Sequence, residues 1–488
     1  MGKQPASPES VAVLIENSKR GIYDSEKLLE KIEDTKTIFE SISTIEGTAL
    51  EFLQIVFELL SGSLSGMYEG FNGLQNMLQT DSIYAKRYHM QMINLCQYEW
   101  CKYFLGRDGN GVLVRLINFL KDCNDDVTNT YLQDLRLLIK TLGGNCDKDL
   151  RNMTAHYDKP SQMYQKMLTL NSEDEYAIRL GMQMEIHDKV LKLTNTIFTT
   201  IFSNIPSANT TEHKTRIQTD IEIQTFINSQ IAEAFDKKTD LKTIISDQIL
   251  EAWTEVESMK KLFSQCDVGI SFLQQQRLDT TSIKYLQSLV EIRWIITFMR
   301  SDLICSMDSY LKASSIIERS ICLHRIYRFE IAALTQLYGY NDDKKSESIW
   351  HKLKGISEFV TNPMSNEVEK QLEELTTHID CTRRNLYTHY REERQLNISE
   401  RWQAFEKMSH VKELKQLLKL ILLCNRIDKC LISLLASLQE LQNKKTKNIL
   451  DIISKIRNLG IKYENQSVID TSDKLVSYLG FKDKNNND

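Results

Sequence analysis

The sequence predicts an all-α protein, and three observations carry that prediction. Apolar residues recur three and four positions apart along almost the whole chain, which is the spacing of one face of a helix. Only 5 prolines and 18 glycines interrupt the 488 residues, so long helices can run without a break. Alternation with a period of two is hard to find, and we therefore expect no sheet of any size.

The individual helices follow from apolar stripes with helical spacing. In chain order, the segments that carry this spacing most clearly are 28–42, 131–142, 173–202, 367–379 and 411–441. Because each stripe covers one side of its segment, each helix should bury that side against a neighbour.

Glycine and proline residues, which interrupt helices, indicate where one helix should end and the next begin. The pair Gly143 and Gly144 should end one helix and let Asn145 or Asp147 cap the next. Pro160 should stop that next helix just before itself, because a proline disfavours helical backbone in the preceding residue.

A small, polar stretch near the middle of the chain divides the protein into two helical halves. It covers 203–211 and contains Pro206, a composition typical of a linker. We therefore expect an N-terminal helical domain over 1–205, a linker over 206–219 and a C-terminal helical domain over 220–481. The polar tail 482–488 should be disordered.

Composition and charge narrow the class of protein. Hydrophobic residues make up 41% of the chain and charged residues 26%, which is typical of a globular protein with a core. The formal net charge of −5 argues against a broad, sequence-independent nucleic-acid binder, although a small basic cleft on an acidic body stays compatible with it. No signal peptide or membrane-spanning run is found, so we expect a cytoplasmic protein. The 10 cysteines include no Cys-x-x-Cys pair, and we expect most to be buried thiols without disulfides.

One short motif, Arg-Asn-x-x-x-His-Tyr, occurs twice. On a helix, the asparagine and the histidine of each copy lie four residues apart on one face, with the arginine on a neighbouring ridge. The two copies lie 384 − 151 = 233 residues apart, which indicates a duplicated helical unit. The candidate catalytic residues are Arg151, Asn152, His156, Arg384, Asn385 and His389.

These residue types suit the cleavage of RNA. A guanidinium binds phosphate through a planar, permanently charged fork, and an imidazole exchanges protons near neutral pH. RNA supplies its own nucleophile in the 2′-hydroxyl, so two histidines and two arginines provide a base, an acid and the cations that stabilise the phosphorane. We therefore predict a composite site with 2′,3′-cyclic phosphate and 5′-hydroxyl products. The tyrosine after each histidine, Tyr157 or Tyr390, either stacks on a base or packs in the core.

The motif resembles that of the HEPN superfamily, which is defined by Arg-x(4–6)-His, often with asparagine directly after the arginine. The resemblance implies helical-bundle domains that dimerise and share one composite ribonuclease site. Two such domains in one chain would form an intramolecular pseudo-dimer. Because family members are frequent in toxin–antitoxin, phage-defence and CRISPR systems, it also implies a defence or toxin effector. RNA is then the substrate, and a regulatory partner, an inhibitor or an activating signal is expected, while the presence of a homo-oligomer stays open.

Two other classes of function stay open. The chain is either a non-catalytic helical module that binds RNA, a nucleotide or a protein partner, or a scaffold in which the motif is a structural relic. No cofactor is predicted, since the sequence lacks both a Walker-type loop and a dinucleotide fingerprint. No metal site is predicted either, since the remaining histidines show no ligand spacing with carboxylates or cysteines.

Two further pairs of ionisable residues lie outside the two motifs. Arg319 and His324 fit the loose Arg-x(4)-His pattern but lack the asparagine and the tyrosine, so we assign them a structural role. Glu99 and Glu330 each lie in an apolar helical segment. They either orient a motif arginine across the bundle or face solvent.

Overall fold

The structure, a computed structural model, confirms the all-α class, since every regular element in the part that it describes is a helix. The chain divides into two compact units, Met1–Arg426 and Ile427–Asp488. Besides Val13, Glu16 and Arg20, the described residues are 47–106, 109–121, 126–149, 157, 160–170, 173–202, 241–275, 279–313, 316–339, 348–355, 364–377, 409–462 and 464–478.

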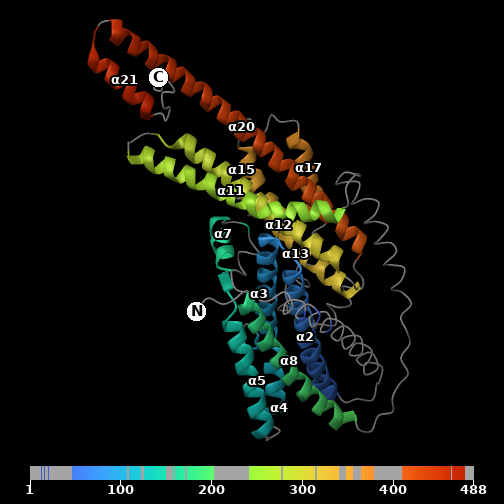
Figure 1. Cartoon of the computed structure of the whole chain (residues 1–488). Coiled ribbons are helices and arrows are strands. Elements are labelled where there is room, and N and C mark those ends of the chain that lie inside the picture. The colour runs from blue at the N-terminus through green and yellow to red at the C-terminus, as the bar shows by residue number, and fades with distance from the viewer. Residues whose placement is uncertain are drawn as a thin grey trace. The chain divides into compact units, whose positions relative to one another are not determined.

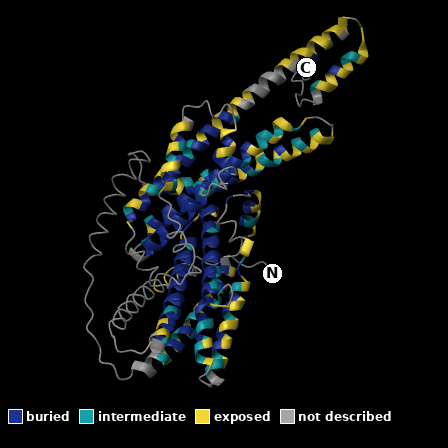
Figure 2. Ribbon diagram, turned by 180° about the vertical axis from the view of Figure 1, so that it is seen from behind, coloured by how far each residue is buried: buried dark blue, intermediate teal, exposed yellow. Residues whose placement is uncertain are grey.

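The first part of unit 1 is a bundle in which α2, α3, α5 and α8 run side by side (Figure 1). Its core contains apolar residues from all four helices and from the short α4, and Figure 2 shows most of α2 and α3 as buried. The helices are α2 (Gly47–Leu78), α3 (Ile83–Leu105), α4 (Val112–Leu120), α5 (Asp126–Gly144), α7 (Pro160–Thr169) and α8 (Glu173–Phe202).

The second part of unit 1 is also helical. The long pair α11 and α12 pack along each other, α12 packs on α13, and α13 contacts α15 and α17 (Figure 1). The helices are α11 (Leu241–Gln275), α12 (Thr281–Lys312), α13 (Ile316–Tyr338), α15 (Ile349–Lys354), α17 (Met364–Thr377) and the first turns of α20 (His410–Lys462), up to Arg426.

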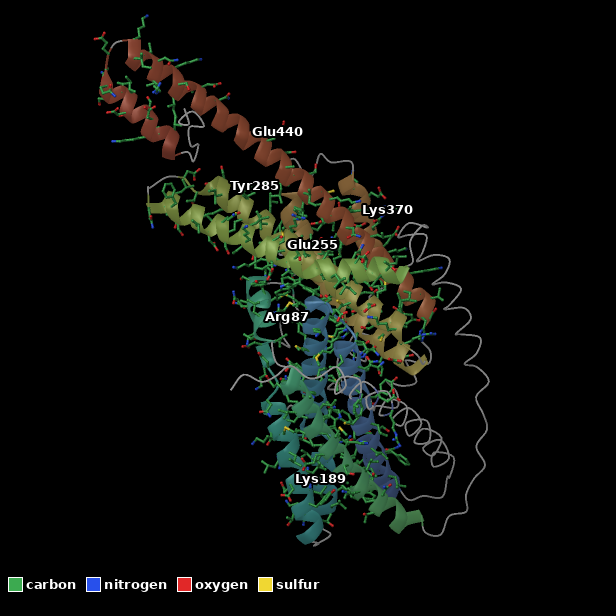
Figure 3. All side chains as sticks on the ribbon, in the orientation of Figure 1. Arg87, Lys189, Glu255, Tyr285, Lys370 and Glu440 are labelled. Carbon is green, nitrogen blue, oxygen red and sulfur yellow. The ribbon has the colours of Figure 1, made fainter. Side chains whose placement is uncertain are left out.

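Contacts join the two parts of unit 1, which come from different predicted halves of the chain. Helix α3 packs on α11 and α12. On α3, the Arg87 guanidinium lies 3.9 Å from the ring centroid of Trp253 on α11, and Figure 3 labels Arg87. Arg325 of α13 donates to Asn72 Oδ1 of α2 at 3.0 Å and to the Glu69 carbonyl at 3.2 Å. The predicted halves are therefore in contact, while their arrangement as a pseudo-dimer stays a prediction, as do the domain limits.

Unit 2 contains the rest of α20 and helix α21 (Gln466–Tyr478). Glu464, with φ 52°, lies in the turn between them. Arg457 on α20 donates to Asp473 Oδ1 on α21 at 2.6 Å, so α21 folds back along the end of α20.

Local sequence features coincide with several helix ends. The predicted segment 173–202 coincides with α8, and 131–142 lies within α5, which ends at Gly144. Asp147 Oδ1 accepts from the Asp149 amide at 2.9 Å, so Asp147 caps the following turn as predicted. Pro160 has a role that the prediction missed, because it is the first residue of α7, where its missing N–H costs nothing. Segment 28–42, the linker 206–219 and the tail 482–488 lie outside the described residues.

The eight cysteines in the described ranges are free thiols and all of them are buried, as predicted for most cysteines of the chain. No helix in those same ranges combines the length and the hydropathy that crossing a bilayer requires.

The close packing of α2 on α3 depends on Gly66. A Cβ atom at this position would lie 2.2 Å from Trp100 Cδ1, well inside van der Waals contact. Trp100 cannot easily move aside, because it is fully buried and its indole N–H donates to the Gly62 carbonyl at 2.8 Å. We therefore expect Gly66→Ala to lower the free energy of unfolding by about 1–3 kcal/mol, the usual cost of overpacking a core, when measured by urea titration.

Gly181 provides the matched control for this substitution. It also lies within a helix, α8, but it is exposed and a Cβ there would meet no atom within 4 Å. Gly181→Ala should raise the free energy of unfolding by up to about 1 kcal/mol through helix propensity alone. Equal effects of the two substitutions would contradict the role of Gly66 in close packing.

Candidate functional site

The residues on either side of the first motif can be described, although the motif residues themselves cannot. Arg151, Asn152, His156, Arg384, Asn385 and His389 all lie outside the described residues. Asp147 precedes the first copy and Tyr157 directly follows its histidine, and both are described. The site can therefore be built from what these two flanking residues contact.

Tyr157 lies in the core. Its side chain is 0% exposed, and its hydroxyl donates to Asp302 Oδ2 on α12 at 2.9 Å. Of the two roles that the sequence left open for this tyrosine, packing is therefore the one observed. Tyr390, the equivalent residue after the second motif, lies outside the described residues. We name the hydrogen bond between Tyr157 and Asp302 the downstream anchor of the first motif.

Asp302 is a buried carboxyl group with two phenol partners. Its other oxygen, Oδ1, accepts from the Tyr84 hydroxyl of α3 at 2.8 Å. Burial raises the pKa of Asp302 to about 7, because the charged form loses its hydration, although both phenol hydrogen bonds favour that form. The group can therefore exist in either protonation state near neutral pH. Burial also raises the pKa of Tyr84 and Tyr157 well above the ordinary value, so both phenols stay protonated and act as donors.

The polar cluster continues along the same helix. One turn beyond Asp302, the Ser306 hydroxyl donates to the Asp302 backbone carbonyl at 2.8 Å and lies 2.7 Å from the hydroxyl of Tyr88 on α3. Since Tyr84 and Tyr88 are themselves one turn apart, α3 and α12 meet along two successive layers of hydrogen-bonded side chains. Each buried polar group in these layers has a hydrogen-bond partner, which offsets the free-energy cost of removing the group from water.

A second set of contacts fixes the chain before the first motif. Asn94 of α3 accepts from the Asp147 amide at 2.9 Å and donates to the Asp147 carbonyl at 3.0 Å. Arg179 of α8, itself buried, donates to Asn94 Oδ1 at 2.9 Å and to the Asn145 carbonyl at 3.2 Å. Lys166 of α7 pairs with the Asp147 carboxylate at 2.9 Å. We name this set the upstream anchor.

The two glutamates that the sequence singled out are both buried. Glu99 is 4% exposed and Glu330 is 6% exposed, so the alternative that they face solvent is wrong. Burial, and the nearby Glu413, raise the pKa of Glu330 well above its ordinary value. Any contact with a motif arginine would lie outside the described part of the chain.

The third apparent motif is part of an ordinary core helix. Arg319 and His324 both lie on α13, five residues apart and therefore about 140° apart around the helix. His324 is buried, whereas Arg319 is half-buried. The arginine and histidine of each motif have the same five-residue separation, so this spacing does not distinguish the pair from the motifs, and its structural role stays a prediction.

Two other histidines are hydrogen-bonded to hydroxyl groups. His187 Nδ1 lies 2.8 Å from the Ser63 hydroxyl, and His410 lies 3.1 Å from the Tyr310 hydroxyl and 3.3 Å from that of Ser320. Within the described ranges, no three side chains of the histidine, cysteine, aspartate or glutamate type gather as metal ligands would.

The anchors contain the residues that sequence reasoning missed. Asp302 had a signal, because it is one of few charges in the apolar run from Trp294 to Tyr310, and an acidic residue in such a run is buried only with partners. No local sequence feature indicates the roles of Asn94 and Arg179, since their partners are 53 and 85 residues away in sequence.

No family model, curated protein or solved structure matches this chain.

Proposed function

We propose that this chain is a metal-independent endoribonuclease whose active site is shared between the two Arg-Asn-x-x-x-His motifs. One histidine would deprotonate the 2′-hydroxyl of the RNA, and the other would protonate the leaving 5′-oxygen. The two arginines would bind the scissile phosphate and stabilise the charge that develops on it.

The observation that carries the proposal is the hydrogen bond between Tyr157 and Asp302. It joins the end of the first motif to α12, a helix of the second predicted half. A composite site needs the two halves to lie against each other near the motifs, and this contact supports that requirement at the first motif. The upstream anchor adds to the support, because it attaches the same motif to α3, α7 and α8.

The repeated sequence supports the catalytic part of the proposal. Each copy supplies one group that exchanges protons and one permanent cation. A single copy is an incomplete catalyst for this reaction, whereas two copies provide every group that it needs. The resemblance to HEPN proteins further supports a defence or toxin role, in which a partner or signal restrains the activity.

The proposal predicts cleavage of RNA without any divalent metal. The purified chain should cut a set of structured RNAs in the presence of EDTA and leave 2′,3′-cyclic phosphate and 5′-hydroxyl ends. A matched DNA substrate should resist, because it lacks the 2′-hydroxyl. End-group analysis of the products provides the measurement.

Other outcomes of this experiment would favour a different function. Products with 3′-hydroxyl ends would contradict attack by the 2′-hydroxyl. Binding of RNA without cleavage, weakened by Arg151→Ala or Arg384→Ala, would favour a non-catalytic binding module instead.

A further inference from the structure

We propose that Asp302 is a positioning residue, which through Tyr157 fixes the segment that carries His156. This inference rests on the proposed function, because it assigns to Asp302 a role at the same site. Asp302 itself would touch neither the RNA nor the reacting atoms.

Tyr157 connects the first motif to the core. It directly follows His156, so a single peptide bond links the anchored residue to the motif histidine. The phenol is fully buried and donates to a carboxyl group that is itself buried, at 2.9 Å. Breaking this bond inside the core would leave the Tyr157 hydroxyl and Asp302 Oδ2 without a partner, which makes the contact a strong restraint.

The upstream anchor attaches the chain on the other side of the first motif. The Asp147 amide donates to Asn94 Oδ1 and the Asp147 carbonyl accepts from the Asn94 amide group, while Arg179 donates to the same Asn94 Oδ1. The segment between Asp147 and Tyr157 is thus attached at each end to buried side chains. Loss of either anchor should therefore release one end of the motif and leave the other end in place.

Proton transfer explains why such a restraint would matter. A general base or acid must come within hydrogen-bond reach of the proton it transfers, and a misplacement of about 1 Å can cost on the order of a hundredfold in rate. A histidine at the end of an unrestrained segment would rarely meet this condition. The downstream anchor should therefore affect the rate of the chemical step more than the affinity for RNA.

The two oxygens of Asp302 offer a matched pair of variants. Tyr157→Phe removes the hydrogen bond to Oδ2, and Tyr84→Phe removes the one to Oδ1 together with a longer one, of 3.3 Å, to the Phe298 carbonyl. Both tyrosines are 0% exposed, and both lose only a hydroxyl group. Only Tyr157, however, adjoins a motif histidine, so the comparison separates positioning from a general loss of core stability.

The experiment measures hydrogen–deuterium exchange and RNA cleavage on the full chain. Both variants should show a similar fall in melting temperature. Tyr157→Phe should speed exchange at least threefold in peptides that cover 150–158, and lower kcat tenfold or more with KM nearly unchanged. Tyr84→Phe should leave the exchange rate of these peptides and kcat within about twofold of the wild type.

The two readouts distinguish failure of this inference from failure of the proposed function. If the wild type cleaves RNA but the two variants behave alike in exchange and in kcat, Asp302 has no positioning role and the ribonuclease proposal stands. If the wild type cleaves no RNA, the proposed function and any catalytic role of Asp302 are both wrong. Faster exchange in Tyr157→Phe alone would then show only that Asp302 restrains this segment.

Discussion

Replacing His156 with alanine is expected to abolish RNA cleavage, and replacing His389 is expected to do the same. In a composite site one histidine is the base and the other is the acid, so neither can substitute for the other. Loss of one positioned acid or base usually costs about 10²–10⁴ in rate. Single-turnover cleavage in EDTA, with enzyme in excess over RNA, measures the chemical step directly.

His351 supplies the control for these two variants. It is an exposed histidine on α15 and belongs to neither motif. His351→Ala should cleave at the wild-type rate. Full activity in both motif variants would contradict the shared site, and loss in only one would assign the catalysis to a single copy.

The second large effect is expected in the pH dependence of stability, at Asp302. Burial raises the pKa of this carboxyl group from 3.8 to about 7, so the folded protein retains a proton that the unfolded chain releases. The resulting stabilisation is complete below about pH 4 and is lost as the pH rises towards 7. A shift of about three pKa units corresponds to a loss on the order of 4 kcal/mol. Urea titrations at several pH values should show it as the difference between the wild type and Asp302→Asn.

His187 should make the free energy of unfolding depend on pH in the opposite direction, and it therefore serves as the control. Burial lowers its pKa from 6.5 to about 4, so the folded protein keeps it neutral where the unfolded chain binds a proton. Its contribution is complete above about pH 6.5 and is lost as the pH falls towards 4. The difference in free energy of unfolding between the wild type and His187→Gln should thus rise with pH, whereas that between the wild type and Asp302→Asn should fall. No change with pH for Asp302→Asn would contradict the buried proton on Asp302.

Local features of the fold were predictable from the sequence. The limits of α8 follow from its apolar spacing, and the end of α5 follows from the glycines at 143 and 144. The capping role of Asp147 was among the predictions because a cap contacts its own neighbours in the chain. The start of α7 at Pro160 is a further role that was not predicted, since a proline suited to end one helix is equally suited to begin another.

The surroundings of the candidate site were not predictable in the same way. Tyr157 and Asp302 are 145 residues apart, and Tyr84 and Asp302 are 218 apart, so no local pattern links them. Burial of Glu99 and Glu330 likewise depends on which helices cover them. The sequence identifies which residues could perform chemistry, whereas long-range packing selects the side chains that attach them to the core.

The buried cysteines also allow local opening of the fold to be measured. Desolvation raises the pKa of Cys146 to about 11 and that of Cys322 to about 12, so their reactive thiolate forms are scarce at neutral pH. A thiol reagent should therefore modify such a cysteine mainly when the surrounding helices separate, and its rate of reaction reports that local opening. These natural probes lie on or beside α3, α5, α11, α12, α13 and α20, so labelling followed by mass spectrometry would compare the local stability of these helices without any engineered residue.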